Sequence, residues 1–254
     1  MIQEFERIAD IKRLDFIVDV LNRNLPKNAT VLDVGCGNGI ISRGLGRKGF
    51  NVLGIDISEK TIENAKALND LPNVTFQVMS AEQLAISETK YHAVICSEVL
   101  EHLQQPENLL KVLHQSTKDE GILIVTVPNG KGPREVFVTK PTQALQRKNN
   151  WLWKFLKKTK GSLGYKGTTV QSSADDLTHI QFFTKKSLEK LAHDNSFKIV
   201  RFGKTNFVED VFPFSILTKR IKFLQKLDCK IAEILPYSVN GGFVTVWKKS
   251  GSES

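Results

Sequence analysis

Three glycines spaced two residues apart constrain this chain more than any other feature. Gly35, Gly37 and Gly39 directly follow the apolar run 31–34, and the apolar residues of 40–48 recur at helical spacing. A short apolar run bounded by turn residues is typical of a strand buried on both faces. Glycines let the backbone turn sharply and approach a ligand closely, because no Cβ intervenes. The pattern predicts a strand, a tight turn and a helix whose N-terminus faces a bound ligand.

A second apolar run, 52–55, ends at Asp56, which follows Gly35 by twenty-one residues. A carboxylate at the tip of a neighbouring parallel strand is well placed to accept hydrogen bonds from both hydroxyls of a ribose. A dinucleotide fingerprint would require its third glycine at position 40, where this chain has Ile40. The spacing therefore predicts a nucleoside ligand and disfavours an NAD-binding oxidoreductase.

The glycine turn resembles the acidic-x-Gly-x-Gly-x-Gly signature of the class I S-adenosylmethionine-dependent methyltransferases, with Asp33 as its acidic residue. The resemblance extends over residues 10–130 and more loosely over 179–203. Within it, residues 79–84 match the adenine segment, 91–103 match the fourth strand and its helix, and 121–129 match the fifth strand and its exit. It implies an α/β fold with a seven-stranded, mostly parallel Rossmann-like sheet, closed by an antiparallel hairpin. It also implies S-adenosylmethionine as the cofactor.

Strand and helix patterns alternate along the first half of the chain, which is typical of a parallel sheet with right-handed crossovers. The predicted segments are helix 2–24, strand 30–34, helix 39–48, strand 51–55, helix 58–69, and strands 73–78 and 91–95, then helix 106–117, strand 121–127, helix 184–192, strand 197–202, helix 214–235 and strand 242–247. We therefore expect a cofactor-binding α/β core over 1–130, an inserted cap or lid over 131–180, and a return to the core over 181–254.

Positive charge is concentrated in one segment of the chain. The formal net charge is +9, and residues 131–170 hold ten basic side chains against one acid, Glu135. This basic cap also contains Trp151 and Trp153 beside lysines, which suits an interfacial helix or a substrate lid. We expect the segment to contact a membrane surface or an anionic substrate, with a solvated loop as the equally open alternative.

The three cysteines, Cys36, Cys96 and Cys229, are scattered and odd in number, so we expect reduced structural thiols. The sequence contains neither a signal-peptide pattern nor an apolar run long enough to span a bilayer. The expected location is the cytoplasm, with peripheral contact at a membrane.

The resemblance assigns the cofactor contacts residue by residue. The loop amides of Gly35, Gly37 and Gly39, together with Asp33, would surround the methionine moiety and its ammonium, and Asp56 would hold the ribose. Arg13 would lie near the methionine carboxylate, and Ser97 would lie at the end of the fourth strand. The residues near adenine would be Ser80, Ala81 and Glu82. The family commonly has Asp where Ser80 stands, and Arg13 is equally well explained as part of a solvated helix face.

The predicted chemistry centres on Glu98, Glu101 and His102, which share one face if the segment is helical. In one interpretation, His102 is the general base for a hydroxyl nucleophile and the Glu98 carboxylate orients it. In the other, Glu98, Glu101 and His102 are joined by His179 and hold a divalent metal that lowers the pKa of the hydroxyl. The arrangement is similar to both ubiquinone-pathway O-methyltransferases and small-RNA terminal 2′-O-methyltransferases.

The leading prediction is an enzyme that transfers methyl from S-adenosylmethionine to an oxygen of a small or lipid-linked acceptor. Methylation of RNA is an alternative, although the cap contains no recognisable RNA-binding motif. A non-catalytic scaffold that keeps the cofactor fold is another. Fold alone does not decide the acceptor.

Overall fold

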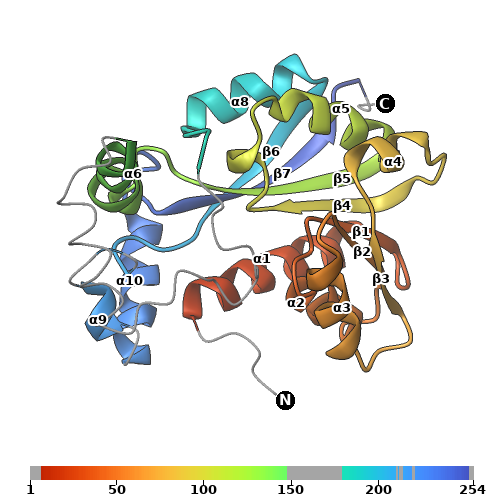
Figure 1. Cartoon of the computed structure of the whole chain (residues 1–254), viewed down its shortest axis with the longest axis horizontal. Helices are drawn as coiled ribbons and strands as arrows, with labels where there is room; N and C mark the ends of the chain where they lie inside the picture. The colour runs from red at the N-terminus through yellow and green to blue at the C-terminus, as the bar shows by residue number, and fades with distance from the viewer. Residues whose placement is uncertain (1–6, 148–178, 210, 212–213, 219–220, 252–254) are drawn as a thin grey trace.

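A seven-stranded sheet forms the centre of the computed structural model, which describes residues 7–147, 179–209, 211, 214–218 and 221–251 (Figure 1). The strand order is β3-β2-β1-β4-β5-β7-β6. The strands are β1 Thr30–Val34, β2 Asn51–Asp56, β3 Val74–Val78, β4 Tyr91–Ser97, β5 Thr117–Pro128, β6 Phe197–Lys204 and β7 Gly242–Lys249. β7 pairs antiparallel with both β5 and β6, and the other pairs are parallel. The predicted sheet and its closing hairpin are confirmed.

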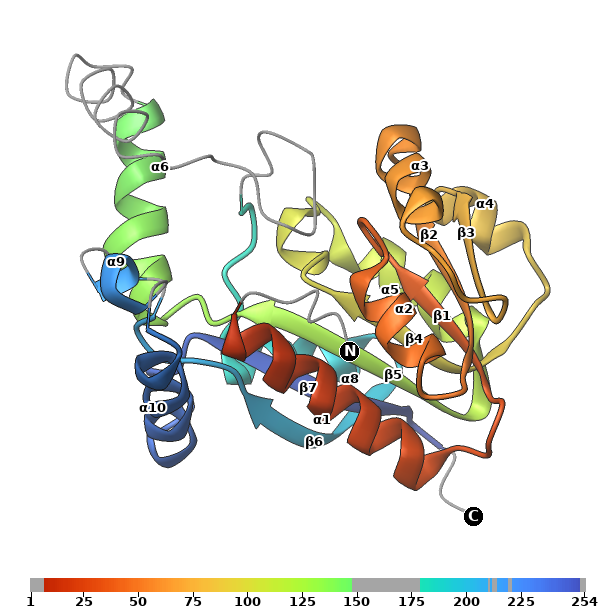
Figure 2. The same cartoon turned by 90° about the horizontal axis from the view of Figure 1, so that it is seen from below.

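Helices cover both faces of the sheet, so the molecule has three layers (Figures 1 and 2). α1 Ile8–Asn24, α2 Ile40–Gly46 and α3 Glu59–Ala67 pack on one face, and α4 Ala81–Ile86, α5 Pro106–Ser116 and α8 Lys185–Asp194 pack on the other. Each face has its own apolar core, with residues of β1, β4 and β5 contributing to both. Burial on both faces explains why these strands are continuous apolar runs.

Side chains at helix starts fix where several helices begin. Ser58 accepts a hydrogen bond from the Thr61 amide at 3.3 Å at the start of α3. Thr184 and Ser187 form a reciprocal capping box at the start of α8. Each cap satisfies backbone N–H groups that have no partner within the helix.

The predicted helix 214–235 is wrong, because the structure has two helices there, α9 Phe214–Thr218 and α10 Lys222–Ile234. Ile221, between them, has an extended backbone with φ −122° and ψ 95°. The Gln225 side chain donates to the Thr218 carbonyl at 2.8 Å, which satisfies an acceptor that the break releases. Helical periodicity continues across this break, so the sequence pattern does not reveal it.

Within the expected cap 131–180, the structure describes 131–147 and 179–180, and the first of these ranges contains η2 Glu135–Thr139, a single π-helical turn, followed by α6 Lys140–Arg147. α6, α9 and α10 gather at one end of the molecule in both views (Figures 1 and 2). Trp151, Trp153 and most of the basic segment lie outside the described residues, so the division at residues 130 and 180 stays a prediction. None of the described helices has the length and apolar character needed to cross a bilayer.

The three cysteines are buried and carry free thiols, as predicted. Burial raises the pKa of the Cys36 and Cys96 thiols, which keeps them protonated and unreactive at neutral pH.

Candidate functional site

The glycine loop between β1 and α2 has the backbone conformation that its sequence predicts. Gly35, Gly37 and Gly39 have φ values of +68°, +56° and +76°. A Cβ at Gly35 would lie 2.5 Å from Cγ2 of Val99, so this loop touches the segment that follows β4. The contact brings the predicted cofactor loop and the predicted catalytic segment together at the carboxyl edge of the sheet, where open α/β sheets bind ligands.

Four amides of the glycine loop donate within the protein, and the expectation that the loop surrounds the methionine moiety stays a prediction. The amides of Gly35 and Cys36 donate to the Ile55 carbonyl at 2.8 and 3.0 Å, and the Gly39 amide donates to the Cys36 carbonyl at 3.0 Å. The Gly37 amide donates to the Asp56 carboxylate. The loop is thereby tied to β2, and what it offers a ligand is close approach to bare Cα atoms.

Asp56 ends β2 beside this loop and stands half-buried. Its Oδ2 accepts from the Gly37 amide at 3.1 Å and its Oδ1 from the Ser58 amide at 2.9 Å. Each carboxylate oxygen can accept a further hydrogen bond. The fixed carboxylate and the glycine turn fit the ribose and amino-acid parts of S-adenosylmethionine, so the residues present fit this cofactor.

Asp33 lies beneath the glycine loop and is 1% exposed. Its Oδ2 accepts from the Ser42 hydroxyl at 2.6 Å. Burial raises the pKa of Asp33 to about 6, the Ser42 hydrogen bond opposes the rise, and the nearby Asp56 charge adds to it. Asp33 therefore anchors the start of α2, and its contact with the cofactor stays a prediction.

Ser97 and Arg13 converge on Glu98 from different elements. The Ser97 hydroxyl lies 2.8 Å from the Thr126 hydroxyl, which donates to Glu98 Oε1 at 2.9 Å. Arg13 on α1 is buried, and its Nη1 lies 3.9 Å from Glu98 Oε1. Its Nε has no hydrogen-bond partner among the residues described. Burial makes the solvated-face alternative wrong for Arg13.

The residues predicted to lie near adenine begin α4. Ser80 is its N-cap and forms a capping box with Gln83, and Ala81 and Glu82 form the first helical turn. The Ser80 side chain is therefore engaged with its own helix, and the contact of this turn with adenine stays a prediction.

The predicted helical face that carries Glu98, Glu101 and His102 is wrong. Glu98 precedes the helical turn with φ +58°, and only η1 Leu100–His102 is helical, as a short 3₁₀ turn. Glu98 thus turns toward Arg13. Glu101, His102 and His179 gather instead, with one ligand atom from each lying within 4.8 Å of the others. Glu98 lies outside this group in the structure.

Backbone hydrogen bonds bring His179 to this cluster across a long sequence separation. The amides of Ile180 and Gln181 both donate to the Glu101 carbonyl, at 2.7 and 2.9 Å. The rings of His102 and His179 meet edge to face with centroids 5.2 Å apart. The sequence expectation that these two histidines approach each other is met by this geometry, and their role as ligands stays a prediction.

Glu101 is 1% exposed, and burial raises its pKa well above the ordinary value, with the Glu98 charge adding to the rise. Its Oε2 is buried and has no hydrogen-bond partner in the described part of the chain. A buried carboxylate oxygen without a partner beside two imidazoles fits a site for a divalent cation. The residues present therefore fit a metal as well as the cofactor.

The structure adds Glu135, which sequence analysis did not assign to the site. Glu135 is 1% exposed, and its Oε2 lies 3.3 Å from His179 Nδ1. Its signal in the sequence is that it is the one acid among ten bases in 131–170.

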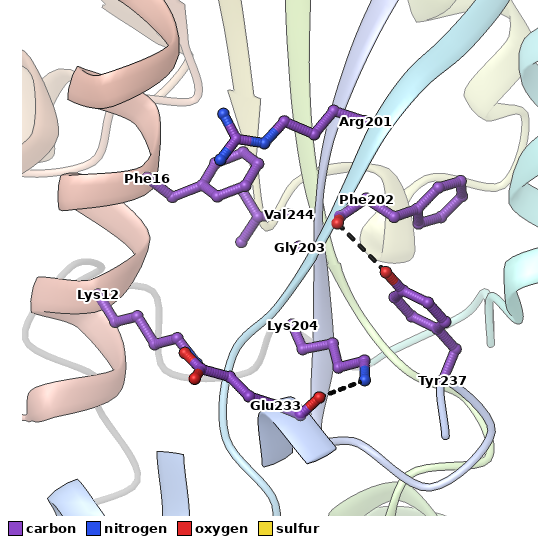
Figure 3. Close-up of a pocket in the computed structure, with 9 residues that line it drawn as sticks. All are labelled: Lys12, Phe16, Arg201, Phe202, Gly203, Lys204, Glu233, Tyr237 and Val244. Atoms are coloured by element: carbon purple, nitrogen blue, oxygen red, sulfur yellow. Dashed lines mark hydrogen bonds and ion pairs between the residues drawn. The ribbon is translucent and has the colours of Figure 1, made fainter. Parts of the chain in front are cut away.

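A separate cavity of about 280 Å³ lies between α1, β6 and α10 and contains none of the predicted site residues (Figure 3). Lys12 forms an ion pair with Glu233 at 3.0 Å, and Lys204 donates to the Glu233 carbonyl at 2.8 Å. The Tyr237 hydroxyl donates to the Phe202 carbonyl at 3.3 Å. These polar groups hold α10 against the sheet, so we assign the cavity a structural role.

Comparison with known proteins shows the family of the chain. Residues 5–201 match the family model described as a methyltransferase domain. The chain belongs to this family, the class I S-adenosylmethionine-dependent methyltransferases. The NAD-binding alternative is therefore not favoured.

Among curated relatives, the ubiquinone biosynthesis O-methyltransferase of Hydrogenovibrio crunogenus is 37% identical over 106 residues, covering 41% of this chain and 44% of that protein. That of Neisseria meningitidis is 32% identical over 141 residues, covering 52% of this chain and 56% of that protein. The chain spans about half the length of the curated relatives it matches.

Solved structures share the fold over nearly the whole chain. The magnesium protoporphyrin IX methyltransferase of Synechocystis, solved with bound SAH, has a TM-score of 0.54 at 21% identity and covers 96% of this chain and 84% of its own. A putative sarcosine dimethylglycine methyltransferase from Galdieria sulphuraria has a TM-score of 0.59 at 13% identity, with coverages of 94% and 85%.

Proposed function

We propose that this chain transfers the methyl group of S-adenosylmethionine to a hydroxyl oxygen of a small or lipid-linked acceptor. The observation that carries the proposal is the contact between Gly35 and Val99, which joins the cofactor loop to the segment bearing Glu98 and His102. Methyl transfer mainly needs alignment of the two reactants and exclusion of water. The names of the curated relatives support oxygen as the acceptor atom.

In this proposal, Asp56 binds the ribose, the glycine loop admits the methionine moiety, and buried Arg13 lies close to its carboxylate. S-adenosylmethionine supplies the electrophilic methyl group. His102, with 17% of its side chain exposed, can accept the proton that the acceptor hydroxyl loses. The alternative is that Glu101, His102 and His179 hold a divalent cation, which would lower the pKa of the hydroxyl.

Titration calorimetry with S-adenosylmethionine and NAD tests the cofactor, and we expect binding of the sulfonium compound only. Transfer of labelled methyl to a phenol, with an RNA oligonucleotide as the comparison acceptor, tests the reaction. His102→Gln should reduce transfer and leave cofactor binding intact. A chelator separates the two routes, because it abolishes transfer only where a cation is required. Absence of S-adenosylmethionine binding would contradict the proposed function.

The exposed surface of α10 supports contact with a membrane. Apolar side chains recur along one stripe of this helix, with Phe223 70% and Ile234 87% exposed. Exposed lysines run beside the stripe at 222, 226 and 230. A helix with an exposed apolar stripe and adjacent lysines binds anionic lipid surfaces, where both apolar burial and charge contribute. We propose that α10 brings the site to a lipid-linked acceptor.

Vesicle sedimentation tests this surface. The chain should bind vesicles that contain phosphatidylglycerol more tightly than neutral vesicles, and Phe223→Ser with Ile234→Ser should remove most of the binding. Ile86→Ser is the matched control, because Ile86 is 82% exposed at the end of α4, away from this surface. Equal binding by all three proteins would contradict the membrane contact.

A further inference from the structure

Glu135 is placed against His179 by the way the chain leaves the sheet. The Gly130 amide donates to the Phe183 carbonyl at 2.6 Å, and a Cβ at Gly130 would lie 2.6 Å from the Phe182 backbone. This close approach packs the exit of β5 against the segment 179–184, which carries His179. The π-helical turn η2 begins at Glu135 itself. Such turns are rare and occur frequently at functional sites.

The Glu135 side chain has one engaged oxygen and one without a partner. Oε2 faces His179 Nδ1 at 3.3 Å, whereas Oε1 is buried and accepts no hydrogen bond from the described residues. Glu101 presents a second buried oxygen of the same kind. Leaving either group unsatisfied costs folding free energy, because water is excluded from both.

Protonation alone does not resolve this arrangement. A neutral Glu101 would carry a hydroxyl that needs an acceptor, and its Oε2 has none within the described ranges. Two buried carboxylates together supply two negative charges. A divalent cation would compensate the negative charge and coordinate the unpaired oxygen of Glu101. A ligand set of carboxylate oxygen and imidazole nitrogen suits a transition metal such as manganese.

The contact between Glu135 and His179 also fixes the orientation of the imidazole ring and which ring nitrogen carries the hydrogen. If Nδ1 carries the hydrogen donated to Glu135 Oε2, Nε2 keeps its lone pair for a metal. Carboxylates that accept from metal-binding histidines orient the ring and raise its basicity. Among the residues that the structure describes, Glu135 is the acid that lies against His179 Nδ1.

We propose that Glu135 is the positioning residue of a divalent transition-metal site formed by Glu101, His102 and His179. The inference rests on the proposed methyl transfer, since the cation would act on the acceptor hydroxyl. Glu135 holds the His179 ring by its Nδ1 hydrogen, and its charge complements the cation together with that of Glu101. It thus acts through His179 and contacts neither cofactor nor acceptor.

The test is titration of the chelator-treated, dialysed chain with Mn²⁺ alone and with Co²⁺ alone, read by calorimetry and by Co²⁺ absorption. Glu135→Gln should weaken binding of either cation by about 10- to 100-fold. Glu107→Gln, at an exposed position in α5, is the matched control and should bind like the unchanged chain. The S-adenosylmethionine affinity of all three proteins should agree.

Stability without metal separates positioning from a merely structural role. Because Gln removes a buried negative charge, the metal-free Glu135→Gln protein should be at least as stable as the unchanged chain, while its stabilisation at a given Mn²⁺ concentration is reduced. Cation affinity within twofold of the unchanged chain, or a metal-free variant that is less stable, would overturn the proposal. An unchanged chain that binds S-adenosylmethionine but neither cation overturns this inference and leaves the proposed function standing.

Discussion

The Gly37 amide donates to Asp56 Oδ2 at 3.1 Å, so the glycine loop and the tip of β2 form one unit. The same carboxylate accepts from the Ser58 amide and thereby also joins the start of α3. A ribose bound at Asp56 would therefore meet a carboxylate whose direction two backbone amides have already set. Such preorganisation lowers the entropic cost of binding.

Replacing Asp56 with Ala should remove the predicted ribose acceptor and release the glycine loop. Hydrogen bonds to charged groups contribute about 1.5–3 kcal/mol, so we expect S-adenosylmethionine affinity to fall at least tenfold in calorimetry. Asp70→Ala is the control, since that side chain is 75% exposed and should leave affinity unchanged. Equal affinities in the two variants would show that Asp56 does not hold the cofactor.

Gly35→Ala should harm the site through both conformation and contact. An L-residue at φ +68° costs about 1–2 kcal/mol, and the new Cβ would overlap Val99. Gly49→Ala separates the two effects, because Gly49 has φ +94° and nothing lies within 4 Å of its Cβ position. Urea unfolding should show a larger loss at Gly35, and only that variant should lose cofactor affinity.

A combined Gly35→Ala and Val99→Ala protein isolates the contact. Removing the valine methyls should recover part of the stability lost in Gly35→Ala and none of the part due to backbone strain. If the second substitution recovers nothing, the packing of the loop against the segment after β4 is not what requires glycine there.

Sequence pattern predicts the sheet well because burial on both faces leaves little choice of residue. The run 30–34 is a strand in the structure with the same bounds, and Asp56 lies at the expected strand tip. Side-chain capping likewise marks the starts of α3 and α8. These features are local, so neighbouring residues suffice to encode them.

The failures are contacts that the sequence does not encode locally. The positive φ of Glu98 breaks the expected helical face, because Thr126 and Arg13 hold its carboxylate from other elements. Glu135 meets His179 over a separation of 44 residues. Periodicity within one segment carries no information about such pairs.

The raised pKa of Asp33 predicts that its contribution to the free energy of unfolding falls as pH rises. The pKa is about 6 in the folded chain against about 3.9 when unfolded, so the folded state binds this proton more tightly. The stabilising contribution is complete below pH 4 and is lost as pH rises through 6. Relative to Asp33→Asn, which has no such proton, the unchanged chain should lose about 3 kcal/mol over that interval.

Urea unfolding of both proteins at pH 4, 5, 6 and 7 provides the measurement. The Asn side chain keeps an acceptor for the Ser42 hydroxyl, so the comparison leaves that hydrogen bond in place. Parallel stability curves for the two proteins would mean that Asp33 titrates alike in the folded and unfolded states.

The positive φ of Glu98 predicts that a glycine variant is more stable than an alanine variant, which is the reverse of the order in a helix. At φ +58°, a residue with a Cβ is strained, and glycine relieves that strain. Glu98→Gly should therefore be about 1 kcal/mol more stable than Glu98→Ala, since both lose the bond from Thr126 equally. Glu107 in α5 has a helical backbone, so there the alanine variant should be more stable than the glycine variant by about 1 kcal/mol of unfolding free energy. Both Glu98 variants should lose methyl transfer, because each removes the carboxylate that faces Arg13 Nη1 and accepts from Thr126. The same order at both positions, measured by urea unfolding, would show that Glu98 is not held in a strained conformation.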